Sequence, residues 1–277
     1  MSITGEKRRE TEKIRVLAEQ LLQKELTFLQ FSNHWVFEGT GVVVKCSDET
    51  LDYEMEIAYY CHKHGMPALT ERADYDFGGY KFYVYQRGDD KLNHADVTHF
   101  LGSSLARLHQ LPVPETPKLK THREETELCL SDWRAGYSLL RPQTVDKIEQ
   151  LVQRSLDVPG SHITHGDPIY SNVVRLDKVL YLIDWEHASV GPKEIDLAVL
   201  KYVECFGEST SSFEAIASSY GPYNEEYLDI LLDGRVASSL AWYAHNVLAV
   251  HFERNDEIDK RAAWLDGDHS IVFTKAV

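Results

Sequence analysis

Two Asp residues and one Asn near the middle of the chain have the side-chain types and the spacing that phosphoryl transfer requires. Asp167 is followed five residues later by Asn172, and Asp184 comes after a short run of β-forming residues. In phosphoryl transfer one carboxylate orients the attacking hydroxyl, while an Asn and a second Asp hold the magnesium ions that neutralise the phosphates. Each of these residues alone would suit an ordinary turn or strand end. Together they predict Asp167 as the catalytic carboxylate and Asn172 and Asp184 as ligands of Mg²⁺.

The residues between Asn172 and Asp184 are expected to form a β-hairpin. Two β-rich runs, 173–175 and 179–183, flank a polar turn at 176–178, which is the pattern of two paired strands. Because the strands of a hairpin begin and end side by side, this element would bring Asn172 and Asp184 close enough to share metal ions.

The remaining pattern predicts a β-rich N-terminal part and a helical remainder. We expect a helix over 6–25, strands over 26–31, 35–38 and 41–45, a helix over 51–63, and a strand over 80–85. Further helices are expected after a cap at Asn93 and over 144–156, 211–219, 225–232 and 235–252. In this second part the 173–183 hairpin is the one expected β-element.

The chain resembles the aminoglycoside phosphotransferase and choline kinase family, which are small-molecule kinases with a protein-kinase-like fold. The family's motifs are matched by His165-Gly166-Asp167 with Asn172, by Ile183-Asp184-Trp185-Glu186, and by the segment 191–198. The resemblance is strong over about residues 101–200 and weaker before them. The chain departs from the family at Pro192, where many relatives carry Asp, which changes the local turn and leaves the chemistry intact.

The resemblance implies an α+β, bilobal protein-kinase-like fold. Residues 1–88 would form a nucleotide-binding lobe with a small β-sheet and one main helix, and residues 89–277 a mostly helical catalytic and substrate-binding lobe. The implied activity is transfer of the γ-phosphate of ATP or GTP to a hydroxyl of a small molecule. Asp196 resembles the family's buried carboxylate that braces the catalytic loop, although a helix N-cap would stand at the same place. His165 is expected to be a hydrogen-bonding support of the loop.

A kinase of this type needs a lysine for the donor phosphates and a helix glutamate that holds the lysine. Lys45 ends an apolar strand and is the candidate lysine. Glu54 and Glu56 both lie on the helix expected over 51–63. In the family the glutamate stands about three turns before a Gly-x-Pro segment, here 65–67, and this spacing favours Glu54.

The nucleotide is expected to meet two further segments. Its base would contact the hinge at Gln86, Arg87 and Gly88, mainly through backbone groups, so the sequence does not separate ATP from GTP. Ser32 and Asn33 lie in the turn that would cover the phosphates and could donate hydrogen bonds to them; a plain β-turn is the equal alternative. This turn has no glycine-rich fingerprint of protein kinases.

Acceptor specificity in the family comes from the helical half of the chain. Glu186, beside the metal-binding Asp184, is the first candidate to face the acceptor, and Asp132, Trp133 and Trp242 are further candidates. Acidic and aromatic side chains together suit a cationic group. The alternative for Trp242 is a place in the helix core.

Composition narrows the classes of partner. The formal charge of −15 disfavours nucleic acid and favours cations, although acidity could equally serve solubility alone. The four cysteines are scattered without C-x-x-C spacing, which indicates reduced thiols and neither a zinc site nor a disulfide framework. No apolar run approaches the about 20 residues of a membrane helix, and residues 1–12 lack a signal-peptide core. We therefore expect a cytoplasmic monomer or homodimer without membrane or nucleic-acid partners.

Two other hypotheses compete with a kinase of small cationic molecules, such as an aminoglycoside-like antibiotic or an amino alcohol. A catalytically silent nucleotide-binding or small-molecule-binding protein of the same fold is disfavoured because all expected chemical residues are present. A protein kinase is disfavoured because Asp184 is followed by Trp and Glu instead of Phe and Gly. The sequence does not distinguish antibiotic resistance from a metabolic role.

Overall fold

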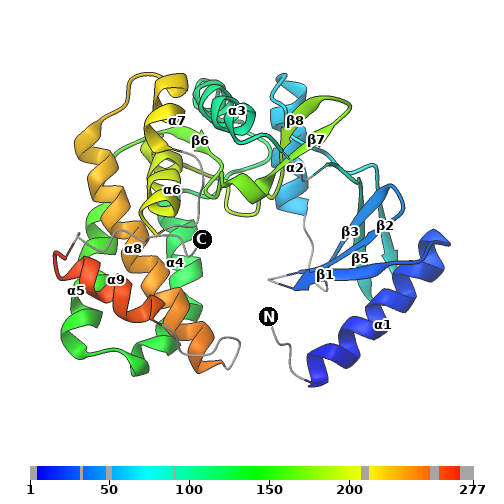
Figure 1. The fold of residues 1–277 in the computed structure, drawn as a ribbon, viewed down its shortest axis with the longest axis horizontal. Coiled ribbons are helices and arrows are strands. Elements are labelled where there is room, and N and C mark those ends of the chain that lie inside the picture. Colours follow the sequence, from blue (N-terminus) through cyan, green and yellow to red (C-terminus); the bar gives the residue numbers. More distant parts are fainter. Residues whose placement is uncertain are drawn as a thin grey trace. The chain divides into compact units, whose positions relative to one another are not determined.

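The chain groups into two units in a computed structural model, which describes residues 5–31, 34–47, 52–89, 92–206, 212–249 and 256–268 (Figure 1). The sheet unit consists of Ser2–Leu92 and Val173–Glu186, and the helical unit of Asn93–Asn172 and His187–Val277. The hairpin segment thus groups with the N-terminal part, although a linear division at residue 88 would have placed it with the helices.

The sheet unit is built on a five-stranded antiparallel sheet with the strand order β1-β2-β3-β5-β4. Its elements are α1 (Gly5–Leu22), β1 (Thr27–Phe31), β2 (Trp35–Gly39), β3 (Val42–Ser47), α2 (Asp52–Lys63), β4 (Ala73–Phe77) and β5 (Tyr80–Gln86). The expected order of elements is correct except for β4, which was missed. This edge strand is mostly exposed, so it carries no alternation of apolar and polar residues that could predict it.

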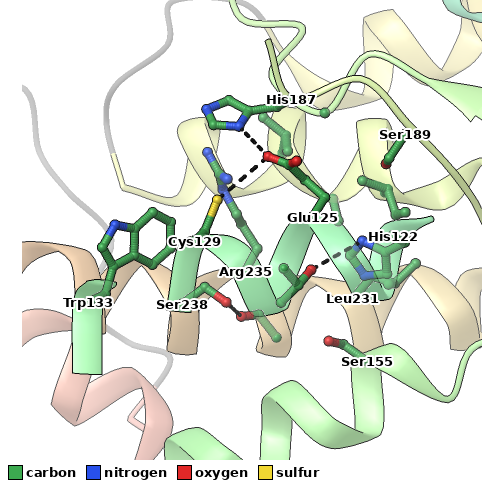
Figure 2. Close-up of a pocket in the computed structure, with 16 residues that line it drawn as sticks. His122, Glu125, Cys129, Trp133, Ser155, His187, Ser189, Leu231, Arg235 and Ser238 are labelled. Atoms are coloured by element: carbon green, nitrogen blue, oxygen red, sulfur yellow. Dashed lines mark hydrogen bonds and ion pairs between the residues drawn. The ribbon is translucent and has the colours of Figure 1, made fainter. Parts of the chain in front are cut away.

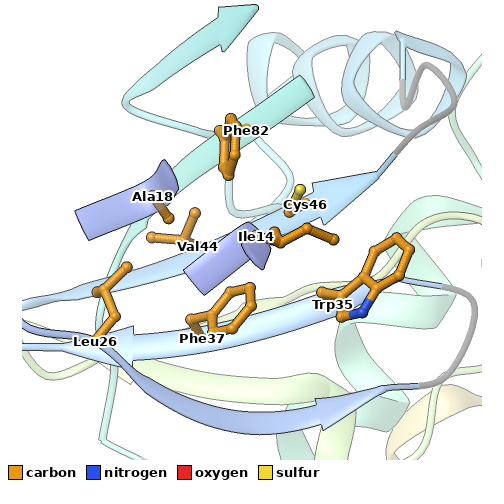
Figure 3. Packing of buried hydrophobic residues seen from close by; sticks show 8 residues of the cluster. All are labelled: Ile14, Ala18, Leu26, Trp35, Phe37, Val44, Cys46 and Phe82. Carbon is orange, nitrogen blue, oxygen red and sulfur yellow. The ribbon is translucent and has the colours of Figure 1, made fainter. Parts of the chain in front are cut away.

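Helix α1 covers one face of the sheet (Figure 3). The core of this face consists of Ile14, Ala18, Leu26, Trp35, Phe37, Val44, Cys46 and Phe82. Val44 and Cys46 point to this face from β3, and because side chains alternate along a strand, Lys45 points to the other face. Tyr83, the register partner of Lys45, packs there against Met55 of α2. Strand alternation therefore turns Lys45 toward α2.

The predicted hairpin is present as β7 (Val173–Leu176) and β8 (Val179–Leu182). Asp177 and Lys178 form its two-residue turn with φ of 46° and 73°. Positive φ at both positions is what the favoured hairpin turn requires. Backbone hydrogen bonds between Asp89 and Arg175, with N···O distances of 2.9 and 3.2 Å, connect β7 with the end of the N-terminal segment.

The helical unit contains α3 (His94–Leu108), α4 (His122–Trp133), α5 (Pro142–Leu156), α6 (Glu194–Cys205), α7 (Phe213–Tyr220), α8 (Glu225–Leu248), α9 (Glu257–Leu265), the 3₁₀ turns η1 (Arg134–Leu139) and η2 (Tyr170–Asn172), and the short strands β6 (His162–Thr164) and β9 (Ser189–Gly191). Helix α8 contacts α4, α5, α6 and α9. None of the described helices is both apolar enough and long enough to span a bilayer.

One expectation for this unit was wrong, and two features were missed. The helices expected over 225–232 and 235–252 are one helix, because Gly234 does not break α8 but lets it approach Ser155 of α5 closely. Helix α4 was missed although Thr121 and Glu124 form the capping box that marks its start. The pairing of β6 with β9 was also missed, since strands of three residues are too short for a periodic signal.

Candidate active site

Lys45 lies between two carboxylates in the sheet unit. Its Nζ is 2.7 Å from Glu54 Oε2 and 2.8 Å from Asp184 Oδ1. Glu54 is buried, whereas Glu56 on the same helix is exposed. The structure thus brings together three residues that the sequence proposed for the phosphates and the metal, and the glutamate in contact with Lys45 is Glu54.

The charges around Lys45 sum to an excess of negative charge. Burial disfavours the ammonium, but the Glu54 and Asp184 carboxylates outweigh burial and raise the pKa of Lys45. Burial raises the pKa of Glu54 against the effect of Lys45, and the charges of Asp184 and Glu186 raise it further. One ammonium therefore faces three carboxylates, which is an environment that a divalent cation would stabilise.

The segment Asp184–Glu186 turns sharply after β8. Asp184 has a φ of 67°, a left-handed conformation that Asp adopts more readily than most residues. Trp185 is buried, with Nε1 donating to the Leu182 carbonyl oxygen at 3.4 Å. Glu186 Oε2 is 3.1 Å from His34 Nε2. Trp185 is thus anchored between two acids with different partners. Asp184 contacts Lys45, and Glu186 contacts His34.

The expected hinge residues follow β5 directly. Gln86 ends β5, with its Oε1 accepting from Arg72. Arg87 donates its backbone N–H to the Gly41 carbonyl oxygen at 3.2 Å and pairs with Glu38 at 2.7 Å.

Gly88 lies so close to β7 that an added Cβ would be 2.9 Å from Val174 Cβ. This position therefore requires glycine. Ser32 and Asn33, the two residues expected to cover the phosphates, lie outside the residues that the structure describes.

Asp167 is held by two side chains within the helical unit. Asn172 Nδ2 donates to the Asp167 carbonyl oxygen at 2.8 Å and to Oδ2 at 3.1 Å. Arg235 of α8 donates from Nη2 to Oδ1 at 3.1 Å. Both carboxylate oxygens of Asp167 are therefore oriented by donors. The sequence interpretation missed Arg235, although a lone Arg within the apolar run of α8 was a signal that could have drawn attention to it.

Asp196 lies fully buried and contacts the loop that carries Asp167. Its Oδ2 accepts from the His165 backbone N–H at 2.9 Å and its Oδ1 from the Gly166 N–H at 2.8 Å. His109 Nε2 also lies 2.9 Å from Oδ2, and Tyr220 contacts the other nitrogen of that ring. Asp196 does not cap helix α6, because Lys193 is the N-cap residue of this helix.

His165 is buried and its Nδ1 accepts from the Asp167 backbone N–H at 3.3 Å. Gly166 between them has a φ of 83°, and a Cβ at this position would overlap the His187 carbonyl oxygen. The loop conformation therefore depends on a glycine here.

A cavity of about 110 Å³ adjoins Gly166 in the helical unit. Figure 2 shows its walls, which include Glu125, Cys129 and Trp133 of α4, His187, and Arg235 of α8. Of the predicted acceptor residues in this unit, Trp133 lines the cavity. Asp132 is exposed, and neither it nor Trp242, whose ring packs against Tyr243, is among the lining residues.

Two ionisable groups of the cavity have pKa values shifted by their surroundings. Burial opposes the charge of Glu125, but hydrogen bonds from His187 and Lys120 outweigh it and lower the pKa of this carboxyl. Burial lowers the pKa of His122 to about 4. Among the residues that the structure describes, the buried His122 Nε2 atom has no hydrogen-bond partner, so a neutral imidazole faces this end of the cavity. Neither residue was predicted from the sequence.

A five-stranded sheet with a buried Lys–Glu pair and a helical unit with an Asp–Asn loop are typical of small-molecule phosphotransferases with a kinase-like fold. The model of the phosphotransferase enzyme family matches residues 42–231. Since this match spans more than half of the chain, the chain belongs to that family.

Solved structures show the same fold. An amicoumacin kinase, solved with AMP-PNP and Ca²⁺, has a TM-score of 0.71 at 13% identity, covering 95% of this chain and 96% of the other. A choline/ethanolamine kinase family protein from Mesorhizobium loti has a TM-score of 0.65 at 15% identity, with 93% and 94% covered. A choline kinase from Streptococcus pneumoniae has a TM-score of 0.63 at 15% identity, with 93% and 99% covered. No curated protein matches the chain.

Proposed function

We propose that this protein transfers the γ-phosphate of ATP or GTP to a hydroxyl group of a small molecule. The observation that carries the proposal is the contact of Lys45 with both Glu54 and Asp184. Kinases use a buried lysine held by a helix glutamate for the donor phosphates, with a metal-binding Asp beside it. The family match supports the same reaction class.

Asp167 is proposed to orient the acceptor hydroxyl and to accept its proton. Asn172 and Arg235 hold its two oxygens, which limits the rotation of the carboxylate before the acceptor binds. A positioned general base typically contributes about 10²- to 10⁴-fold to the rate. In a loose phosphoryl-transfer transition state, orientation of the hydroxyl is as important as removal of its proton.

The residues present fit a magnesium site. Since Asn172 uses Nδ2 to donate to Asp167, its Oδ1 is the atom left for a metal. Asp184 adds a carboxylate in the negatively charged surroundings of Lys45. Asn172 directly precedes β7, and Asp184 comes two residues after the end of β8; on these positions in the sequence we propose that both residues serve magnesium ions. Bound Mg²⁺ would neutralise the donor phosphates.

The nucleotide is proposed to contact the remaining predicted residues of the sheet unit. Lys45 would bind the phosphates while Glu54 holds the ammonium in place. Gln86, Arg87 and Gly88 would present backbone groups to the base at the end of β5. Ser32 and Asn33 stay as proposed phosphate contacts on the basis of sequence position alone.

The acceptor is proposed to occupy the cavity beside Gly166. The net charge of −15 favours a cationic molecule at long range, and Trp133 offers an aromatic face for such a group. The similar structures include kinases named for choline and amicoumacin and a phosphotransferase named for spectinomycin. An aminoglycoside-like antibiotic or an amino alcohol is therefore the first class to test.

A phosphate-transfer screen with ATP and GTP tests the proposal. The acceptor panel should pair amine-bearing molecules, such as aminoglycosides, amino alcohols and macrolides, with neutral sugars. Asp167→Asn should lower turnover by at least about 10²-fold while nucleotide binding persists. Asp177→Asn is the matched control, because Asp177 lies exposed in the β7–β8 turn and Asn accepts its positive φ. If the protein binds nucleotide but turns over none of the acceptors, a catalytically silent binding protein is favoured. If Asp167→Asn keeps near-normal turnover, Asp167 does not have the proposed role.

A further inference from the structure

Three side chains of different ligand chemistry meet on the wall of the cavity beside Gly166. Glu125 and Cys129 lie one turn apart on α4, and His187 approaches them from the segment before β9 (Figure 2). His187 Nδ1 is 2.9 Å from Glu125 Oε1, and Cys129 Sγ is 3.6 Å from the same oxygen. All three ligand atoms lie within 4.8 Å of one another.

We propose that Glu125, Cys129 and His187 form a zinc-binding site. Zinc bonds of about 2.3 Å to sulfur and about 2.0–2.2 Å to nitrogen and oxygen place tetrahedral ligands roughly 3.3–3.6 Å apart. The sulfur–oxygen distance already has this value, and the nitrogen–oxygen distance needs to grow by a few tenths of an ångström. One thiolate, one imidazole and one carboxylate suit Zn²⁺ and disfavour Mg²⁺ and Ca²⁺, which prefer oxygen ligands.

The surroundings of Glu125 prepare it for this role. Lys120 Nζ donates to Oε2 at 2.7 Å, and the other two ligands both face Oε1, so Lys120 and a metal would use different oxygens of the carboxylate. A carboxylate fixed by such an outer donor is typical of metal sites.

The fourth position of the tetrahedron would open into the cavity, because all three ligands line it. Water or a lone-pair donor of a bound molecule would complete the coordination there. The site would also connect α4 to His187, whose carbonyl oxygen lies against Gly166 of the catalytic loop. This inference does not depend on the proposed phosphoryl transfer.

The spacing of the cysteines gave no sign of this site. Ligand pairs close in sequence, such as C-x-x-C, mark the common structural zinc sites, whereas here the third ligand is about 60 residues from the other two. A second group of possible ligands, His34, Glu54 and Glu186 in the sheet unit, contains no sulfur. A probe that reports a metal–thiolate bond therefore distinguishes the two groups.

Cobalt and zinc titrations of the tag-free, nucleotide-free full-length protein test the proposal. Co²⁺ bound to a thiolate gives a near-ultraviolet charge-transfer band, which we expect at one equivalent per chain and which Zn²⁺ should displace. Cys129→Ser should abolish the band, and Glu125→Gln should weaken Zn²⁺ binding by more than the 10- to 100-fold typical of outer-shell changes. The matched controls Cys205→Ser, at another partly buried free thiol, and Glu127→Gln, at an exposed acid of α4, should bind as the unaltered protein does.

A second measurement needs no variant. Zn²⁺ should protect Cys129 of the unaltered protein from alkylation, with the modified residue located by mass spectrometry and Cys205 as the internal reference. Absence of the charge-transfer band, a band that survives Cys129→Ser, or alkylation of Cys129 at an unchanged rate under saturating Zn²⁺ would each overturn the site.

Discussion

Replacing Asp196 by Ala should destabilise the helical unit by about 3–5 kcal/mol. Three buried donors would lose their acceptor, namely the backbone N–H groups of His165 and Gly166 and the Nε2 of His109. Hydrogen bonds to a charged group contribute about 1.5–3 kcal/mol each. The three do not add in full, because removing the buried carboxylate also removes the cost of its desolvation.

Asp196→Asn should cost less, about 1.5–3 kcal/mol. The amide keeps one acceptor oxygen for the Gly166 N–H. Its NH₂ group would stand where Oδ2 now accepts from His165 and His109. The His109 ring can change tautomer and accept from this NH₂ group. The His165 N–H is a donor in every state and cannot bond to the NH₂ group, so the variant loses about one hydrogen bond to a buried charge.

Urea unfolding followed by circular dichroism measures the free energy of unfolding of both variants. If the protein unfolds in two transitions, the loss of stability should appear in the transition of the helical unit. Hydrogen exchange of peptides covering 162–172 should be faster in both variants. Asp229→Ala is the matched control, since Asp229 is 70% exposed and pairs with Lys201 at the surface, where ion pairs contribute about 0–1 kcal/mol. An Asp196→Ala variant within about 1 kcal/mol of the unaltered protein would refute the assignment of Asp196 as the support of the loop.

Three further predictions follow from single positions. Gly166→Ala should lower the free energy of unfolding by more than about 2 kcal/mol, because the added Cβ clashes and the backbone φ is unfavourable for Ala. Gly79 has a φ of 85° but nothing lies within 4 Å of an added Cβ. Thermal unfolding of the control Gly79→Ala should therefore show the cost of the φ angle alone. The pKa of His122, lowered to about 4 from 6.5, means that the unfolded state takes up the proton first, so stability falls as the pH drops from 6.5 toward 4. Between pH 7.5 and pH 5, the free energy of unfolding measured in urea should fall by about 2 kcal/mol more in the unaltered protein than in His122→Leu. An equal fall in the two proteins would contradict a buried neutral imidazole. Lys45→Met should abolish the rise in melting temperature caused by Mg²⁺ and ATP. A rise that persists in this variant would show that Lys45 does not bind the phosphates.

The parts of the fold that the sequence predicted are those with local signals. The strands of the sheet unit other than β4, the β7–β8 hairpin and α2 all follow from residue patterns within a few positions. The contact between Lys45 and Glu54 could be predicted because two local rules combine. Strand alternation turns Lys45 toward α2, and family spacing selects Glu54 on that helix.

The parts that were missed depend on contacts between residues distant in sequence. Arg235 lies 68 positions from Asp167, and no periodicity connects them. The cavity draws its walls from α4, α5, α6 and α8 as well as from the catalytic loop, so its shape follows from helix packing. Helix α4 is a different case, because the capping box at Thr121 was available in the sequence and its weak amphipathic pattern concealed the helix.

The charges of the cavity lead to a more specific view of acceptor recognition than the net charge does. Arg235 on the cavity wall pairs with Asp167, and Glu125 on the cavity wall pairs with Lys120 and contacts His187. A cationic acceptor would therefore have to compete with an internal cation for either carboxylate, and it would gain only the difference between the two interactions. The net charge of −15 can raise the rate at which a cation arrives, but it does not decide which molecule stays. If the acceptor binds in this cavity as proposed, the preference between cationic and neutral acceptors should depend on how readily Arg235 leaves Asp167 and how readily Lys120 leaves Glu125.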